Sequence, residues 1–440
     1  MQLTEQQVLA LAPDAQVAGA GKKLGIAKPW GNIGSSERAV WGECKGSGSR
    51  PYQVRVDRSD YAAKCSCPSH KFPCKHAIGL LVLLASEPAL AAPSAEPEWV
   101  AEWLDKRATS AQQKIERAQS PSEVDEAAQQ KRQEKRAGRM DEGLAALDVW
   151  LADLMRRGLA QIAGEGPAFW EKQAARLVDA QAPGLANRLR ALGEEVGVRD
   201  DWPEHTLAGM GQLALLLKAW QGREHLDPRL RRELELQIGL PAREEEVLAQ
   251  GEQRQDEWQI LAQEIEETAR LRLRRTWLLG RHSAQYALLL HTAVNKQPFT
   301  EHFVPGTSFR AVLHFWPGSY PLRAMTDAQL ENTGVPAAFW HAETMEGFLD
   351  RQADALAVNP WLQRMPLVLS AAIPVQQNGQ WWVLDQEGHG LPVRSHSVNR
   401  LWSWLAHCGG RPADIAGEWQ AGAFHPLAMY FNQRYQVLSD

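Results

Sequence analysis

The spacing of apolar and polar residues near the N-terminus predicts a short helix followed by strands. Residues 1–12 form a helix candidate that Thr4 can cap. Residues 17–36 are rich in glycine, and residues 38–45 read as a strand. Residues 50–58 then alternate apolar and polar side chains, as a half-buried strand does. We therefore expect a small sheet in this part of the chain.

The middle of the chain, residues 99–250, has the apolar spacing of helices almost throughout. Residues 107–139 are highly charged, which favours a solvated helix or flexible arm over a phosphate- or partner-binding segment. The firmest apolar stripe comprises Leu144, Leu147, Leu151, Leu154 and Ile162. We expect one helix of this region to end at Gly193 and another to begin at Asp227, with Pro228 in its first position.

From about Asp256 onward the pattern changes to strands. Strands are predicted at 271–279, 286–292 and 309–315, a hairpin turn at Asn378-Gly379, and helices at about 337–357 and 396–407. In the first of these strands Arg270, Arg272 and Arg274 share one face. We interpret that face as one that protects a sheet edge, with phosphate binding as the alternative.

These patterns predict a multidomain α+β protein. It would consist of an N-terminal segment (1–36), a small ββα metal-binding module (37–86), a linker (87–98), a helical region (99–250) and a C-terminal α+β domain with a largely antiparallel sheet (255–440).

Three of the five cysteines lie within ten residues and indicate a metal site. Cys65 and Cys67 fall on one face of a predicted strand, Cys74 precedes a predicted helix, and His76 lies in its first turn. Three thiolates and one imidazole are the donor set of a closed, tetrahedral zinc site. We expect one structural Zn²⁺ at these four residues. We expect His70, a spare imidazole, to be solvated; its replacement of His76 as the ligand is the alternative.

Other interpretations of the cluster fit less well. Cys65 and Cys67 are poorly placed to form a disulfide with each other, and no secretory signal is visible. A catalytic Cys/His pair needs a single reactive cysteine, so three clustered cysteines exceed that need.

The residues around the cluster resemble those of a known family. The pattern Cys-x-Cys-x6-Cys-x-His, after two strands and before an apolar helix, is similar to the SWIM zinc finger of bacterial SWIM domain-containing proteins. The likeness covers residues from about 30 to 85 and includes Trp41-Gly42-Glu43-Cys44 and Pro51-Tyr52-Gln53-Val54. It implies zinc binding and a role in binding DNA or protein. It also suggests a shared pathway with MoxR-type ATPases and von Willebrand factor A-domain proteins.

The charge of the chain is unevenly distributed. Residues 1–85 carry 11 Lys/Arg and 6 Asp/Glu, a net of +5, so the remainder carries −10 of the total of −5. A basic module on an acidic body suits a nucleic-acid contact, and we name Lys64, Lys71, Lys75 and Arg55 as its candidate residues. The acidic remainder opposes such a contact.

The sequence therefore favours a non-enzymatic zinc-binding protein that contacts DNA, RNA or another protein. The alternative is an adaptor or client-recruiting subunit of an ATPase assembly, whose large body with exposed tryptophans would make the main interface. An enzyme within residues 256–440 is a third hypothesis, although no nucleotide-binding or hydrolase motif is present. We expect a cytoplasmic location and no membrane span, and the sequence does not fix the oligomeric state.

Overall fold

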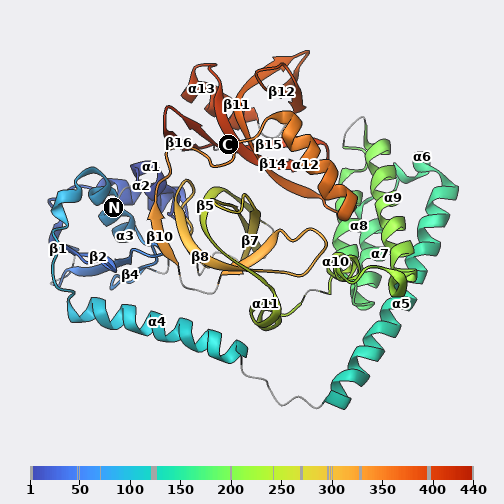
Figure 1. The fold of residues 1–440 in the computed structure, drawn as a ribbon, viewed down its shortest axis with the longest axis horizontal. Coiled ribbons are helices and arrows are strands. Elements are labelled where there is room, and N and C mark those ends of the chain that lie inside the picture. Colours follow the sequence, from blue (N-terminus) through green and yellow to red (C-terminus); the bar gives the residue numbers. More distant parts are fainter. Residues whose placement is uncertain are drawn as a thin grey trace.

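The computed structural model places four bodies side by side (Figure 1). It describes residues 3–438 except 47, 49, 70, 120–125, 199–200, 241, 268–270, 295–296, 298, 300, 327–329 and 394–397. The side chains at 111–136, 160 and 250 also lie outside the described part. His70 and Arg270, both named above, are among the residues not described, and most side chains of the charged segment 107–139 lie outside the described part.

The N-terminal module is a four-stranded antiparallel sheet with helices on one face. Its strands pair in the order β1-β2-β3-β4. The elements are α1 (Glu5–Ala10), α2 (Ala15–Leu24), β1 (Trp30–Ser35), β2 (Ala39–Cys44), β3 (Tyr52–Asp57), β4 (Ala63–Cys65) and α3 (Lys75–Ser86). Thr4 caps α1 as predicted, by accepting from the backbone N–H of Gln7.

Helix α2 lies in the glycine-rich segment, which gave no helix prediction. Its glycines permit a close crossing with α3, because a Cβ atom at Gly21 would lie 2.5 Å from Cγ2 of Ile78. A Cβ atom at Gly79 of α3 would lie 2.7 Å from Cβ of Leu24. These glycines lower helix propensity, but the contact between the two helices requires them.

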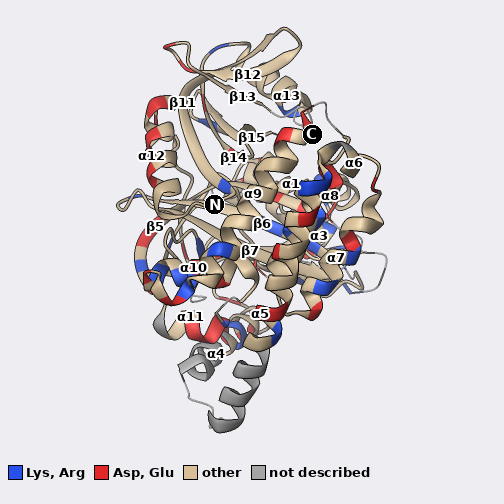
Figure 2. Cartoon of the chain, turned by 90° about the vertical axis from the view of Figure 1, so that its right-hand side faces the viewer, with Lys and Arg blue, Asp and Glu red and all other residues tan. Residues whose placement is uncertain are grey.

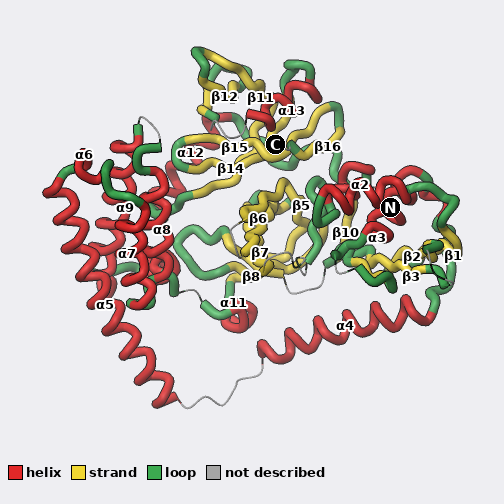
Figure 3. Tube along the Cα trace, turned by 180° about the vertical axis from the view of Figure 1, so that it is seen from behind, coloured by secondary structure: helices red, strands yellow, loops and turns green. Residues whose placement is uncertain are grey.

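The segment predicted as a linker is packed against the sheet. Ser35 of β1 accepts from the N–H of Ser94, and a short helical turn, η1 (Pro88–Leu90), precedes these contacts. Helix α4 (Glu98–Gln119) then crosses the sheet face opposite α3, where Trp99 and Trp103 pack against a small core that includes Trp41. Figures 1 and 3 show α4 running from this module toward α11. The first helix of the predicted helical region therefore belongs with the N-terminal module.

Most of the helices that follow α4 form a bundle with its own core. They are α5 (Glu126–Arg157), α6 (Leu159–Ile162), α7 (Pro167–Asp179), α8 (Pro183–Glu195), α9 (Trp202–Gln221), η2 (Arg223–His225) and α10 (Pro228–Ile238). Helix α11 (Glu244–Gln250) contributes no residue to this core and packs against α4. The predicted stripe from Leu144 to Ile162 is buried in that core. Asp227 caps α10 as predicted. The predicted stop at Gly193 was wrong, because α8 continues to Glu195; a Cβ atom at Gly193 would lie 2.4 Å from Cγ of Trp170.

The first sheet of the C-terminal region closes into a barrel. Its strands are β5 (Glu252–Glu267), β6 (Leu271–Gly280), β7 (Tyr286–Val294), β8 (Ser308–Phe315), β9 (Arg323–Thr326) and β10 (Glu331–Gly334). Strand β9 pairs parallel with β7 and antiparallel with β8, so β5, β6, β7, β9 and β8 form a closed cycle. All five strands contribute to one core: Trp258, Ile260, Leu278, Ala287, Leu289, Phe309, Ala311, Leu313, Phe315 and Ala324.

The second sheet repeats this order. Its elements are β11 (Arg364–Gln377), β12 (Gln380–Leu384), β13 (Gly390–Pro392), α13 (Val398–Cys408), β14 (Ala413–Gln420), β15 (Ala423–Phe431) and β16 (Arg434–Val437), and α12 (Met345–Val358) precedes them. A parallel bridge between Val393 and Phe424 joins the end of β13 to β15, which gives the cycle β11, β12, β13, β15, β14. In both barrels the strands follow the order first, second, third, fifth, fourth, which is the Greek-key arrangement of OB-folds.

The structure confirms several local predictions for this region. The Asn378-Gly379 turn joins β11 to β12, and both residues have the positive φ that this hairpin turn requires, 52° and 79°. Helix α12 begins at Met345, later than predicted, because Thr344 caps it there. The sheets are antiparallel except at the closing pairs β7–β9 and β13–β15.

The interpretation of the arginine row was wrong. Strand β6 lies inside the sheet and not at its edge. Arg274 is buried over the ring of Phe299 and donates to the carbonyl of Glu301, and Arg275 is buried in an ion pair with Glu418 of β14. These side chains serve packing within and between the barrels.

Candidate metal centre and its surroundings

The four predicted metal ligands lie on elements that the local sequence fixes in place. Strand β4 pairs with β3 so that Cys65 is opposite Val54, on the sheet face that α3 covers. The chain continues the pairing for one residue, because the N–H of Ser66 donates to the carbonyl of Gln53. Cys67 therefore stays beside Cys65, and its N–H donates to the Cys65 thiol at 3.5 Å.

The other two ligands come from the start of α3. Cys74 is the N-cap residue, and its carbonyl accepts from the N–H of Ile78. His76 lies two residues further, in the first turn, and its ring packs against Tyr52 at a centroid distance of 4.9 Å. The N-terminus of a helix carries positive potential, which favours a thiolate at this position.

The donor atoms converge at distances that fit a tetrahedral metal. All four lie within 4.8 Å of one another and all four residues are buried. The Nδ1 atom of His76 is 3.8 Å from Sγ of Cys65 and 3.9 Å from Sγ of Cys74. Zn–S bonds of ~2.3 Å in a tetrahedron imply donor–donor edges of ~3.8 Å. The residues present therefore fit a zinc ion bound through Nδ1 and three sulfurs.

The acidities of the thiols also favour a cation. The hydrogen bond from Cys65 places the pKa of Cys74 at about 4, with His76 and the N–H of Ala77 adding to the effect. The same bond, together with burial, raises the pKa of Cys65, and burial raises that of Cys67. Three thiolates in one buried site repel each other, and a divalent cation removes that repulsion.

The structure separates the four predicted contact residues. Arg55 and Lys64 are opposite each other on the sheet face that α4 crosses. The Arg55 guanidinium lies over Trp99 and Trp103, at 5.2 and 5.8 Å from the ring centroids, and burial lowers its pKa. Lys64 is exposed. Arg55 is therefore engaged within the molecule.

The other two predicted residues belong to the opposite side of the sheet. Lys71 forms an ion pair of 2.7 Å with Asp14, the residue that caps α2. Lys75 is exposed in the first turn of α3. Of the four, Lys64 and Lys75 thus present their charges to solvent, and they do so from different faces.

Two further lysines lie near Lys75 and were not identified from the sequence. The N–H of Lys45 donates to the carbonyl of Pro29, which brings Lys45 beside Lys28. Cys44, the neighbour of Lys45, lies close enough to Lys75 for that charge to counteract the rise that burial causes in its pKa. Lys28, Lys45 and Lys75 are exposed, and within the described part of the chain none of them has an ion-pair partner. The group of Lys28, Lys45 and Lys75 becomes visible only through the pairing of β1 with β2, which brings together residues that are not adjacent in sequence.

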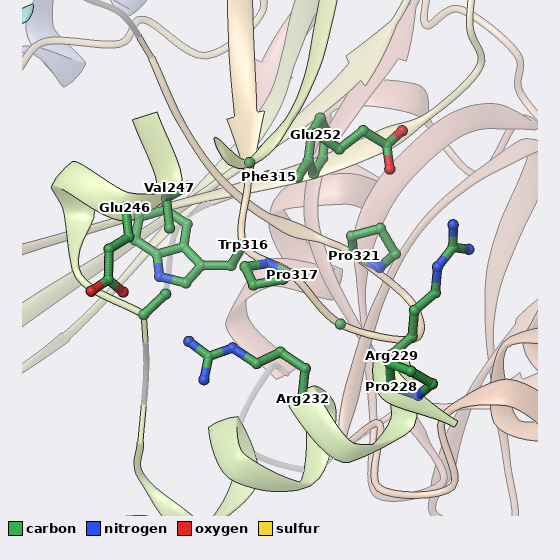
Figure 4. Close-up of a pocket in the computed structure, with 13 residues that line it drawn as sticks. Pro228, Arg229, Arg232, Glu246, Val247, Glu252, Phe315, Trp316, Pro317 and Pro321 are labelled. Atoms are coloured by element: carbon green, nitrogen blue, oxygen red, sulfur yellow. The ribbon is translucent and has the colours of Figure 1, made fainter. Parts of the chain in front are cut away.

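A second concave site lies where the helical bundle meets the first barrel. It has a volume of about 530 Å³ and is lined by residues of α10, α11 and the β8–β9 loop. Figure 4 shows Arg229 and Arg232 on α10, Glu246 on α11, and Trp316 beside Pro317 of the loop. Its two carboxylates are already paired, Glu246 with Arg243 at 2.8 Å and Glu252 with Arg254 at 3.0 Å.

The acidity of Glu246 does not suit this pocket for acid catalysis. Burial acts to raise the pKa of Glu246, but hydrogen bonds from Arg243 hold it below its ordinary value. A general acid in such a site needs a raised pKa. The pocket offers apolar surface and the exposed guanidinium of Arg229.

Comparison with known families agrees with this geometry. Residues 52–84 match the SWIM zinc finger, and residues 135–238 match the SWIM-associated four-helix bundle domain. This chain is a SWIM domain-containing protein. The SWIM zinc finger spans β3 to α3 and holds all four predicted ligands, and the bundle domain spans most of α5 through α10. Comparisons with curated proteins and with solved structures gave no match. None of the described helices combines the length and apolar character that a bilayer crossing requires.

Proposed function

We propose that the SWIM module holds one structural Zn²⁺ and contacts the phosphates of a nucleic acid, without catalysis by this protein. Four protein ligands fill a tetrahedral zinc ion, so no position remains for a substrate or a water. The metal would join β4 to α3 and fix the surface around them. A cytoplasmic location, where thiols stay reduced, is part of this proposal.

One observation carries the proposed contact: Lys28, Lys45 and Lys75 are exposed beside the metal centre without carboxylate partners in the described chain. Two other lysines of the module are paired, Lys22 with Glu5 at 2.7 Å and Lys71 with Asp14 at 2.7 Å, and Lys64 is exposed on the opposite face of the sheet. Unpaired lysines gathered at one end of a module are what phosphate binding needs.

The charge of the rest of the molecule restricts the proposed nucleic-acid contact to the end of the module that carries Lys28, Lys45 and Lys75. Figure 2 shows Lys and Arg interspersed with Asp and Glu along the helices of the bundle. Binding should therefore be weak at physiological salt, non-specific in sequence and steeply dependent on salt concentration.

The test is a titration of the zinc-loaded full chain with single- and double-stranded DNA at several salt concentrations. The test variant replaces Lys28, Lys45 and Lys75 with Gln. The control variant replaces three lysines that are already ion-paired, Lys22, Lys71 and Lys106, and so removes the same charge. The plot of the logarithm of the binding constant against the logarithm of the salt concentration has a slope that counts phosphate contacts. In the test variant we expect the magnitude of this slope to fall by about 0.9 for each phosphate contact removed, and we expect the control to behave as the wild type.

Two results would contradict the proposal. Absence of binding by the wild type at low salt would exclude a nucleic-acid contact. Equal losses in the two triple variants would show that net charge, and not this group of lysines, drives the binding. Zinc content is measured on every variant, so that a damaged metal centre is not mistaken for a lost contact.

A protein partner is the second candidate, and exposed apolar residues of the C-terminal region favour it. Trp402 of α13 is 55% exposed, and Leu349 and Leu356 of α12 are also exposed. Tryptophan is enriched at the centres of protein interfaces. The ATPase assembly suggested by the family resemblance is the first partner to test, by co-purification with the wild type and with Trp402→Ser.

A further inference from the structure

The two barrels carry equivalent rows of side chains on their outer faces. In the first barrel, Trp277 of the second strand lies between Ala262 of the first strand and Leu288 of the third. In the second barrel, Trp382 of the second strand lies between Val375 of the first and Pro392 of the third. In both, an apolar residue and a leucine follow the tryptophan: Trp277-Leu278-Leu279 and Trp382-Val383-Leu384. Strand order and sequence thus repeat together.

The row of the first barrel is covered by another sheet. Trp277 is 1% exposed and packs in one cluster with Ala416 and Ala428 of the second barrel. Its Nε1–H donates to Glu418 at 2.7 Å, and Arg275 pairs with the same carboxylate. The outer face of the second and third strands is therefore used, in this molecule, to bind the face of another β-sheet.

Among the residues that the structure describes, no other sheet covers the row of the second barrel. Trp382, Val375 and Pro392 are half-buried and belong to none of the hydrophobic clusters, whereas their neighbours Trp381 and Val383 point into the barrel core. A Cβ atom at Gly390 would lie 3.3 Å from Cε3 of Trp382, so the indole lies over the third strand. Figures 1 and 3 show β12 projecting away from the other bodies.

This face, which we call the β12 face, carries no charge at its outward positions. These are the positions that alternate with the core residues of β11, β12 and β13: Ile373, Val375, Gln377, Gln380, Trp382, Leu384, Gly390 and Pro392. Nucleic acid is a poor occupant, because OB-fold faces that bind it combine aromatic residues with positive charge. A strongly charged protein partner would be poorly matched for the same reason.

We propose that the β12 face binds the β12 face of a second copy of this chain, in a two-fold symmetric dimer. An uncharged face meets its own copy without placing like charges together. Two-fold dimers with self-complementary interfaces are the commonest oligomers. The first barrel shows that this type of face accepts a sheet packed against it. This proposal does not rest on the proposed function, since the lysines beside the metal centre belong to another body of the molecule.

The size of the face sets the expected strength of the dimer. Stable interfaces bury about 800 Å² on each partner, and eight residues on three short strands supply less than that. We expect association in the micromolar range. Sedimentation of the zinc-loaded full chain should therefore be followed from about 1 to 300 μM.

The test variant is the double substitution Trp382→Ser and Leu384→Ser. The matched control is Val358→Ser, which removes an exposed apolar side chain from helix α12, outside the β12 face. We expect the dissociation constant to rise about tenfold or more in the double variant and to be unchanged in the control. Zinc content and thermal unfolding show whether each variant is folded.

A second pair of variants covers the case in which the double variant does not fold. Gln377→Lys changes an exposed residue of the β12 face and places like charges across the two-fold axis, and Gln386→Lys changes an exposed residue of the adjacent loop as a control. We expect weaker association for Gln377→Lys, with partial recovery at high salt. A wild type that is monomeric over the whole range, or a dimer that both β12-face variants leave unchanged, would overturn the proposal.

Discussion

The SWIM module and the helical bundle hold their folds together in different ways. The core of the module includes three of its four metal ligands, Cys65, Cys67 and Cys74, among its buried residues. The core of the bundle is mainly apolar, with Leu147, Trp170 and Leu213 among its buried side chains. A few residues at fixed spacing thus determine the first fold, whereas the second depends on many residues that share one periodic pattern.

This difference determines how each region responds to a substitution. Apparent binding energies of structural zinc in small finger peptides are about 10–16 kcal/mol, so the loss of one ligand can remove the whole fold. One leucine of a bundle contributes about 2–5 kcal/mol. The module should therefore fail as a unit, and the bundle should weaken by degrees.

The largest expected effect is the loss of a metal ligand. Cys74→Ser should lose the zinc and the amide protection of residues 39–86, while the bundle keeps its protection. Zinc analysis measures the metal content, and hydrogen exchange measures the amide protection. Cys44→Ser is the matched control, since Cys44 is buried one strand away and is not a ligand. Full zinc occupancy in Cys74→Ser would show that the ligand set is wrong.

The next effect concerns the bundle. Leu147→Ala leaves a cavity at a fully buried position and should lower the free energy of unfolding of the bundle by about 2–5 kcal/mol. Zinc content should stay at the wild-type value. The control is Val149→Ala, because Val149 is 63% exposed, and its cost should be near zero. If Leu147→Ala also released the zinc, the two regions would not be independent.

The metal ligands could be predicted because their chemistry is local. Cys65 and Cys67 share a strand face and Cys74 and His76 share a helix start, so about a dozen residues contain the whole site. The helices of the bundle were also visible, since periodicity and the cap at Asp227 are local signals. The proposed phosphate-contact residues were harder to predict. Helix α4 covers Arg55, and the chain before β1 brings Lys28 beside Lys45, and both contacts join residues far apart in the sequence.

The barrels show why strand patterns do not determine topology. Alternation along β6 separates Arg274 from Arg275 but does not say which face is the interior of a barrel. The face of β6 that becomes the interior depends on the parallel pairing of β7 with β9 and on the packing of β14 against β6. Both are contacts between residues far apart in the chain. The repeated strand order became visible only when both closures were known.

A smaller effect is expected where α4 joins the module. The guanidinium of Arg107 forms ion pairs with Asp57 at 3.2 Å and Asp60 at 2.6 Å, so Arg107→Ala leaves two half-buried carboxylates without their cation. We expect this substitution to lower the free energy of opening of α4 from the sheet by about 1–3 kcal/mol, as measured by amide exchange in α4. Lys106→Ala is the control, because its ion pair with Glu102 is exposed and spans 3.7 Å. Equal exchange in the two variants would mean that Trp99 and Trp103 alone hold the helix.

The smallest effect depends on pH and arises at Glu96, in the segment between α3 and α4. Hydrogen bonds from Arg38, which also pairs with Asp105, and from Ser36 lower the pKa of Glu96. A carboxyl group with a lowered pKa in the folded state stabilises the fold above its unfolded pKa of about 4.3, and that stabilisation is lost as the pH falls through the folded value. Because Arg38 is half exposed, the contribution should stay below about 1 kcal/mol.

Glu96→Gln isolates this contribution. The variant should be less stable than the wild type near pH 7, and the difference should vanish as the pH falls below the folded pKa of Glu96. The opening free energy of the Ser94 amide, which donates to Ser35 of β1, reports on the contact after correction for intrinsic exchange. Asp105→Asn is the comparison, because its contact with Arg38 is more exposed. A constant difference across pH would mean that Glu96 acts through packing and not through its charge.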